Sequence, residues 1–193
     1  MTVAAEDRRK QIIGAGLDLL REEGLPGLTQ PKIAKRTGLR QSHITYYFPT
    51  RTDLLAAVSH AAIDIQLAVV AGMVDSIKTG RQVTALIAEV TARHDNTRIL
   101  VALNQAADRE PAVRELFQAL NEGFVGEIAR LLSKLGVSDE AGNVDLVHAI
   151  FVGLSVIDLA TSRTRGVARS KAALEALFRL LAVGGDQAPA AGS

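Results

Sequence analysis

The sequence predicts an all-α protein in which an N-terminal head of three helices joins a larger helical bundle, with about nine helices in all. Apolar residues recur at spacings of three and four along nearly the whole chain, and no stretch alternates steadily between apolar and polar residues. Glycine and proline fall between these periodic segments, where helices typically begin and end. With 48% hydrophobic and 22% charged residues, the composition is typical of a folded domain.

The head is predicted to occupy residues 1–55, and its helices have recognisable ends. Gly24 supplies a stop for the first helix, and Thr29 is a typical N-cap for the second. A third helix covers 40–47, and Pro49 ends it. These three segments have the layout of a helix-turn-helix domain.

A fourth helix is predicted to begin at Arg51, where Thr50 and Asp53 match a capping box, and to lead out of the head as far as about residue 78. The body is assigned to 56–183, and its Gly/Ala/Pro-rich continuation over 184–193 is predicted to be disordered. The other helices predicted in the body cover 81–93, 96–108, 112–135, 139–165 and 170–183.

Basic residues gather in the head. Residues 1–55 hold nine Lys or Arg against six Asp or Glu, whereas residues 56–193 hold thirteen against fifteen. Between Glu23 and Asp53 the chain has no carboxylate but five basic residues. This distribution favours a cationic surface that binds a phosphate backbone. The five residues are Lys32, Lys35, Arg36, Arg40 and Arg51.

The predicted helix over 40–47 has two unlike faces. Its apolar face carries Ile44, with Phe48 four residues later, and its opposite face is polar. A recognition helix needs this division, because one face anchors it and the other meets base edges. A solvated basic surface is the alternative, but the helix-turn-helix layout favours DNA. The residues predicted to face bases are Arg40, Gln41, Ser42 and Thr45, and those predicted to contact phosphates are Thr29, Gln30, His43, Tyr46, Tyr47 and Arg51.

The segment 144–160 is apolar nearly all round, and the helix after it has a strong apolar stripe. Such a pair must be covered on both sides, so we predict a four-helix interface with a second copy of the chain. The alternative is that both helices fill the core of one chain. The predicted interface residues are Phe151, Leu154, Ile157, Asp158, Leu174, Leu177, Phe178 and Leu181.

Other functional classes are disfavoured. The chain has no cysteine, which excludes disulfide and thiolate chemistry. No phosphate-binding glycine loop or nucleophile motif is present, and the four histidines lack ligand spacing, so we predict no catalytic site, no metal and no cofactor. The N-terminus lacks the features of a secretory signal, and the longest apolar run, 149–157, is shorter than the about 20 residues of a membrane span. We therefore expect a cytoplasmic protein without a membrane partner.

A series of short motifs runs through residues 8–55. They are Ile12-Ile13 with Ala15 and Leu19-Leu20, then Gly24, Leu28-Thr29, Ile33-Ala34, Gly38-Leu39, Tyr47-Phe48, Thr50-Arg51 and Leu54-Leu55. In this combined spacing, residues 8–55 resemble the DNA-binding domain of the TetR family of transcriptional regulators. Two positions depart from the family pattern: Thr45 stands where a tyrosine is usual, and Arg40 stands where a small hydroxyl cap is usual.

The resemblance implies a homodimer that binds operator DNA, with a pocket for a small-molecule effector in the body. Candidate polar anchors are Gln66, Asn104 and His148, and the candidate walls are otherwise apolar, which implies an apolar or amphipathic effector. The candidate wall residues are Met73, Leu100, Leu103, Phe117, Phe124 and Phe151.

These observations together predict a ligand-responsive transcriptional regulator, a repressor that binds a pseudo-palindromic operator and leaves it when a small molecule binds. Two alternatives remain open from the sequence. One is an activator or a ligand-independent regulator. The other is an all-α carrier or enzyme whose basic head is incidental.

Overall fold

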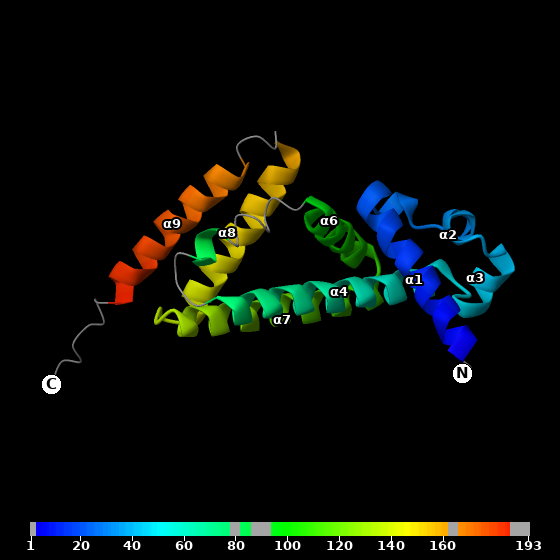
Figure 1. Cartoon of the computed structure of the whole chain (residues 1–193), viewed down its shortest axis with the longest axis horizontal. Coiled ribbons are helices and arrows are strands. Elements are labelled where there is room, and N and C mark those ends of the chain that lie inside the picture. Colours follow the sequence, from blue (N-terminus) through cyan, green and yellow to red (C-terminus); the bar gives the residue numbers. More distant parts are fainter. Residues whose placement is uncertain (1–2, 78–81, 86–93, 162–165, 186–193) are drawn as a thin grey trace. The chain divides into compact units, whose positions relative to one another are not determined.

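The computed structural model describes residues 3–77, 82–85, 94–161 and 166–185, and these ranges contain helices and turns but no strand (Figure 1). The all-α prediction is therefore confirmed. The helices are α1 (Val3–Glu23), the 3-10 turn η1 (Leu25–Gly27), α2 (Gln30–Thr37), α3 (Gln41–Tyr47), α4 (Arg51–Ser76), α6 (His94–Arg109), α7 (Pro111–Lys134), α8 (Ala141–Ala160) and α9 (Gly166–Gly185).

The chain divides into two compact units, and this division differs from the predicted domain limits. The first unit combines Met1–Leu67 with Arg98–Asn121, and the second combines Ala68–Thr97 with Glu122–Ser193. The first unit thus contains α1, α2 and α3 together with parts of α4, α6 and α7. Each unit has its own apolar core.

Local sequence signals set the helix ends in the head. Gly24 follows α1 with a φ of 69°, and Gly38 follows α2 with a φ of 70°, a backbone region that favours glycine. The hydroxyl of Thr29 accepts a hydrogen bond from the Lys32 amide. Asp53 Oδ2 accepts one from the Thr50 amide at 2.9 Å, and Thr50 Oγ1 accepts one from the Asp53 amide at 3.0 Å. The predicted caps and capping box are confirmed.

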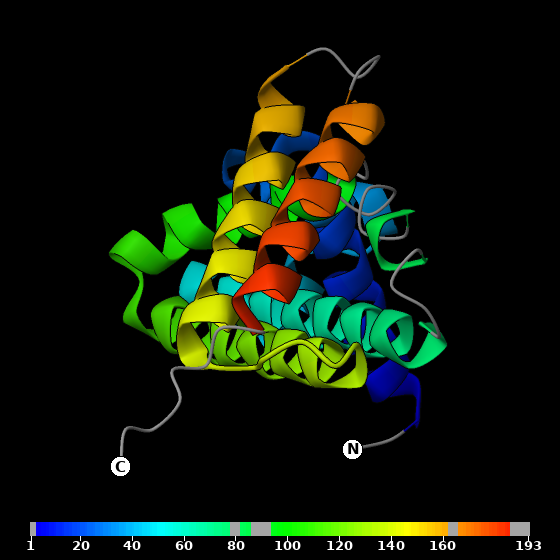
Figure 2. The ribbon, with the colours of Figure 1, turned by 90° about the vertical axis from the view of Figure 1, so that its left-hand side faces the viewer.

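Figures 1 and 2 show α8 and α9 side by side in the second unit. One apolar cluster of this unit joins Val74 of α4 and Leu131 of α7 to Leu154 and Leu174. A second cluster joins α7, α8 and α9 through other side chains. Those side chains are Leu132, Val144, Val147, Leu177 and Leu181.

The predicted helix over 139–165 is too long. α8 ends at Ala160, where Thr161 takes an extended conformation and donates a side-chain hydrogen bond to the Ile157 carbonyl. Gly166, which directly follows this predicted helix, instead begins α9. A Cβ at Gly166 would clash with the carboxylate of Asp158. A larger residue at this position would therefore have to displace that carboxylate, a packing contact that a local stop signal does not reveal.

Two other predictions concern segments that the structure describes only in part. The predicted helix over 81–93 lies mainly outside the described residues, and the four that are described, 82–85, are helical. The tail predicted over 184–193 begins inside α9, which continues through Gly185, and the rest of it lies outside the described residues.

By length and composition alone, α4 and α8 could cross a membrane. The sequence estimate missed this because it counted only the uninterrupted run over 149–157. Both helices nevertheless bury side chains in the protein's own cores, among them Val58 and Val74 of α4 and Val147 and Leu154 of α8. The core helices of a folded bundle have the same composition as a membrane span.

Candidate nucleic-acid interface and effector cavity

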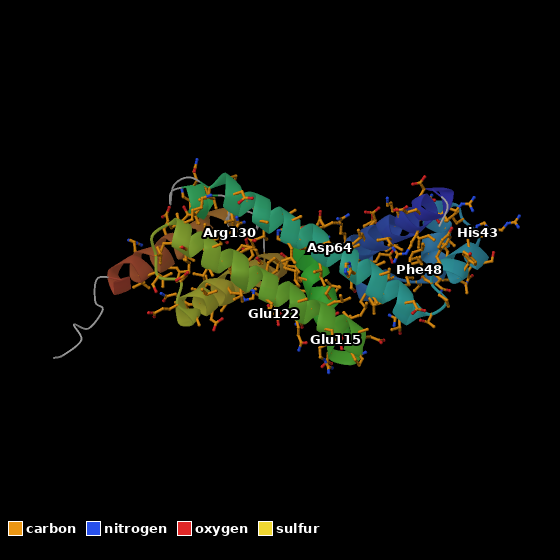
Figure 3. All side chains as sticks on the ribbon, turned by 90° about the horizontal axis from the view of Figure 1, so that it is seen from below. His43, Phe48, Asp64, Glu115, Glu122 and Arg130 are labelled. Atoms are coloured by element: carbon orange, nitrogen blue, oxygen red, sulfur yellow. The ribbon has the colours of Figure 1, made fainter. Side chains whose placement is uncertain are left out.

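The helix α3 has the two faces that a recognition helix requires. Ile44 is fully buried and Phe48 is 2% exposed, so both anchor the helix to the head. Gln41, Ser42 and Thr45 are exposed on the other side. In Figure 3, His43 lies at the outer edge of the head, whereas Phe48 lies within it. The polar face of α3 is therefore free for base edges.

Gln30 at the start of α2 ties α3 in place. Its Nε2 donates a hydrogen bond to the Phe48 carbonyl at 2.9 Å, and its Oε1 lies 3.4 Å from Oγ1 of Thr45. The same hydroxyl lies 3.1 Å from the Gln41 carbonyl oxygen. The sequence predicted a phosphate contact for Gln30. Its half-buried amide instead supports a positioning role within the head.

Replacing Gln30 with alanine is expected to weaken operator binding about fivefold, because the loss of hydrogen bonds worth about 1 kcal/mol loosens α3. The slope of log affinity against log salt concentration should not change, since no phosphate contact is lost. Fluorescence anisotropy titrations at several salt concentrations provide the measurement. If Gln30→Ala lowered the salt slope as much as the loss of a phosphate contact does, Gln30 would contact a phosphate after all.

Exposed groups flank α3 where phosphates could lie. Arg51 is exposed at the N-terminus of α4, and neither Arg51 nor Arg40 forms an ion pair with any residue that the structure describes. Tyr46 is 79% exposed and meets Tyr47 edge to face, with ring centroids 5.1 Å apart. Arg9 of α1, which the sequence reading missed, places its guanidinium 5.5 Å from the Phe48 ring centroid. Arg9 is 39 residues from Phe48 in the sequence, so only the folded structure shows that its guanidinium lies at the end of α3.

Carboxylates from α1 offset part of the positive charge. Glu23 pairs with Lys32, and Glu22 pairs with Arg36. The hydrogen bond with Arg36 holds the pKa of Glu22 below its usual value and raises the pKa of Arg36. The stretch between Glu23 and Asp53 contains no carboxylate, but carboxylates of α1 lie beside it in the folded head. Two of the five basic residues of that stretch, Lys32 and Arg36, are therefore paired within the head.

The second unit has a partly open apolar cavity of about 50 Å³ between α4, α7, α8 and α9. Four of the nine predicted pocket residues line it, namely Met73, Phe124, His148 and Phe151. The sequence reading missed the other lining residues, although the spacing of the apolar stripe on α7 could have identified some of them. They are Val70, Val74, Ile77, Glu127, Ile128, Leu131, Val147 and Leu174.

The other five predicted pocket residues belong to the first unit and do not line this cavity. Gln66 and Leu103 are buried in that unit, and Asn104 is exposed, so its amide faces solvent. Leu100 and Phe117 are half-buried there. The sequence shows which of these side chains are polar and which face of a helix each occupies, but not which of the two units each one packs in.

His148 is the imidazole of the cavity wall. Its ring lies 6.1 Å from the Phe124 ring, edge to face, and it forms no hydrogen bond with another described residue. Burial lowers the pKa of His148, and the nearby Asp145 carboxylate opposes this only in part. The imidazole is therefore neutral near pH 7, with one donor and one acceptor nitrogen.

Cationic side chains of α7 hold the end of α4 beside the cavity. Arg130 bonds Asp75 Oδ1 at 2.5 Å and the Ala71 carbonyl at 3.3 Å, and Figure 3 labels it on α7. Lys134 donates to the carbonyls of Val74 and Asp75 at 2.9 and 3.1 Å. These contacts are called here the α4–α7 clamp, and the Asp75 carbonyl that Lys134 reaches is one that the end of α4 leaves without an intrahelical partner.

Comparisons with known proteins agree with this arrangement. Residues 12–58 match the model described as "Bacterial regulatory proteins, tetR family", and residues 68–183 match "Tetracyclin repressor-like, C-terminal domain". The chain belongs to the TetR family of transcriptional regulators. It is a ligand-responsive, DNA-binding regulator in a family of regulators rather than of enzymes.

Curated relatives of this TetR-family chain include two HTH-type transcriptional regulators. RutR of Escherichia coli strain K12 is 24% identical over 152 residues, which cover 77% of the chain and 71% of RutR. BetI of Burkholderia cenocepacia is 34% identical over 95 residues, which cover 49% of the chain and 48% of BetI.

Solved structures share the fold at low identity. A transcriptional regulator from Saccharomonospora viridis, in complex with choline, has a TM-score of 0.78 and 17% identity, covering 90% of the chain and 96% of that protein. The multidrug binding protein EbrR, complexed with proflavin, has a TM-score of 0.63 and 22% identity, covering 88% of the chain and 99% of EbrR.

The predicted dimer residues of this TetR-family chain are mostly buried within the single chain. Of the eight, only Ile157 is exposed, while Phe151 and Phe178 are half-buried. Asp158 is buried and pairs with Arg169 of α9. The remaining four fill the two clusters of the second unit, as the single-chain alternative expected. These four are Leu154, Leu174, Leu177 and Leu181.

Proposed function

We propose that this TetR-family protein is a cytoplasmic repressor that binds a pseudo-palindromic operator as a homodimer. The observation that carries the proposal is α3, whose apolar side is buried and whose side bearing Gln41, Ser42 and Thr45 is open. In a twofold dimer, two such helices about 34–36 Å apart enter successive major grooves. Arg40 and Gln41 are proposed to contact bases, and Arg51 is proposed to contact a phosphate.

An exposed apolar surface supports the dimer. Leu146, Val156 and Ile157 of α8 are 43–48% exposed, and Leu180 of α9 is 72% exposed. Large apolar side chains exposed on two neighbouring helices favour association with another apolar surface. We propose this face for the twofold contact, in place of the buried side chains that the sequence suggested.

Release by a small molecule is proposed to act through α4. This helix begins at Arg51 beside the recognition helix, and its later residues Val70, Met73 and Val74 line the cavity. A ligand that favours one position of α4 shifts the equilibrium between forms that differ in DNA affinity. The choline and proflavin complexes of two structural neighbours support a ligand site in the body of this fold.

Operator titrations of the wild type, Arg51→Ala and Gln41→Ala test the DNA-binding roles. Arg51→Ala is expected to weaken binding to all sequences and to lower the salt slope by about one per lost contact. Gln41→Ala should instead cost about 1–3 kcal/mol at one base position in each half-site and leave other sequences unaffected. Equal effects of both changes on every sequence would contradict the assigned roles.

Binding to the DNA upstream of the protein's own gene tests whether the protein binds DNA specifically, and a reporter assay tests whether it represses or activates transcription. A carrier or enzyme with an incidental basic head would give no salt-dependent binding to this DNA. Removing a repressor should raise reporter output, whereas removing an activator should lower it. A regulator that does not respond to a ligand would hold its reporter output constant across candidate effectors.

A further inference from the structure

We propose that the effector is an uncharged, mainly apolar molecule with a single hydrogen-bonding group, and that this group meets the imidazole of His148. The inference rests on the proposed function, since it concerns the ligand of the same cavity. Among the lining side chains of α4, α7, α8 and α9, only Glu127 and His148 carry a nitrogen or oxygen atom. The occupant must therefore be apolar over most of its surface.

A charged occupant finds no unshared partner in this lining. Among the lining residues only Glu127 is charged, and its Oε2 already accepts hydrogen bonds from Nε and Nη2 of Arg130 at 3.0 and 2.5 Å. A cation would compete with Arg130 for that carboxylate, and an anion would be repelled by it. Enclosing an unpaired charge among apolar side chains costs several kcal/mol, so the lining selects against ions of both signs.

His148 is the uncharged polar residue of the lining. Its half-buried imidazole has no hydrogen-bond partner among the residues that the structure describes, although the surface that lines the cavity is almost entirely carbon. When the cavity widens, a hydroxyl, carbonyl or amide can pair with an imidazole nitrogen without bringing a charge into the cavity. The imidazole ring meets the Phe124 ring edge to face.

The cavity must widen when the effector enters. Its volume of about 50 Å³ is well below the roughly 300–1,000 Å³ of typical ligand pockets. Met73 is the lining side chain best able to move, because its unbranched thioether adopts many rotamers, and it is only half-buried. Further widening pushes against α4, whose end is held by the α4–α7 clamp. Entry of the ligand and movement of α4 are thereby linked.

Four single-ring probes of similar size test the proposal: benzyl alcohol, toluene, benzylammonium and benzoate. Their dissociation constants are measured by NMR titration of the full chain at pH 7.5. We expect benzyl alcohol to bind at least tenfold more tightly than either ion. His148→Phe should raise the dissociation constant of benzyl alcohol about tenfold and change that of toluene less than threefold. Val152→Ala, at an exposed position on α8 outside the cavity, should leave both dissociation constants unchanged.

Three results would overturn the proposal. The first is an ion that binds as tightly as benzyl alcohol, and the second is no binding of benzyl alcohol. The third is an equal loss of affinity for benzyl alcohol and for toluene when His148 is replaced by phenylalanine. Operator release by each probe is measured separately. Binding of benzyl alcohol without operator release leaves the ligand class intact and contradicts the proposed induction instead.

Discussion

Replacing Ile44 with alanine is expected to destabilise the head by about 2–5 kcal/mol and to abolish measurable operator binding. Ile44 is fully buried and is the only residue of α3 classed as buried, so it anchors the recognition helix from its apolar side. Alanine removes three carbon atoms from a packed interior and leaves a cavity. Much of the about 5–15 kcal/mol that typically stabilises a domain would be lost.

Urea denaturation followed by circular dichroism measures this effect, together with anisotropy titration of operator DNA. Tyr46→Ala is the matched control, because this neighbouring side chain is 79% exposed. Its effect on stability should remain within about 0.5 kcal/mol. If Ile44→Ala and Tyr46→Ala had similar stabilities, the assigned inner and outer faces of α3 would be wrong.

Replacing Arg169 with methionine is expected to destabilise the second unit by about 1–3 kcal/mol at pH 7, less than for a fully buried ion pair because the Arg169 side chain is 42% exposed. Asp158, on α8, is only 4% exposed and pairs with Arg169, on α9. The carboxylate also lies against Gly166, the first residue of α9. Removing the guanidinium leaves a buried carboxylate without its charged partner, and the desolvation of that carboxylate dominates the cost.

Thermal unfolding of the full chain tests the Arg169 prediction. Arg179→Met is the matched control, since Arg179 lies on the same helix, is exposed and bonds only the Glu175 carbonyl among the contacts that the structure describes. We expect its melting temperature to stay close to that of the wild type. Equal melting temperatures for the two variants would show that the pair between α8 and α9 contributes no stability.

The sequence predicts the head well because its signals are local. A cap such as Thr29, or the reciprocal contacts of Thr50 and Asp53, joins residues three positions apart, so spacing alone reveals it. The start of α9 could not be found in this way. A glycine after a helical segment is a local stop signal, but Gly166 begins α9 and lies against the carboxylate of Asp158, eight residues earlier.

The site is predicted less completely than the fold, for a related reason. Gln30 is polar and lies at a helix start, which suggests a phosphate contact, but its amide reaches the Phe48 carbonyl instead. Likewise, the sequence identified α8 as apolar nearly all round and α9 as having an apolar stripe, without showing which of these side chains the chain covers itself. Leu174 belongs to the chain's own core, whereas Leu180, less than two turns later, is exposed.

Recognition of DNA by paired copies of α3 can be tested by sequencing the random duplexes that the wild-type protein and Gln41→Ala select. The wild type should select two half-sites related by a twofold axis, with centres about 10 base pairs or a multiple of that apart. Gln41→Ala should relax the preference at one position in both half-sites. A single asymmetric site, or a preference unchanged by the substitution, would contradict recognition by paired copies of α3.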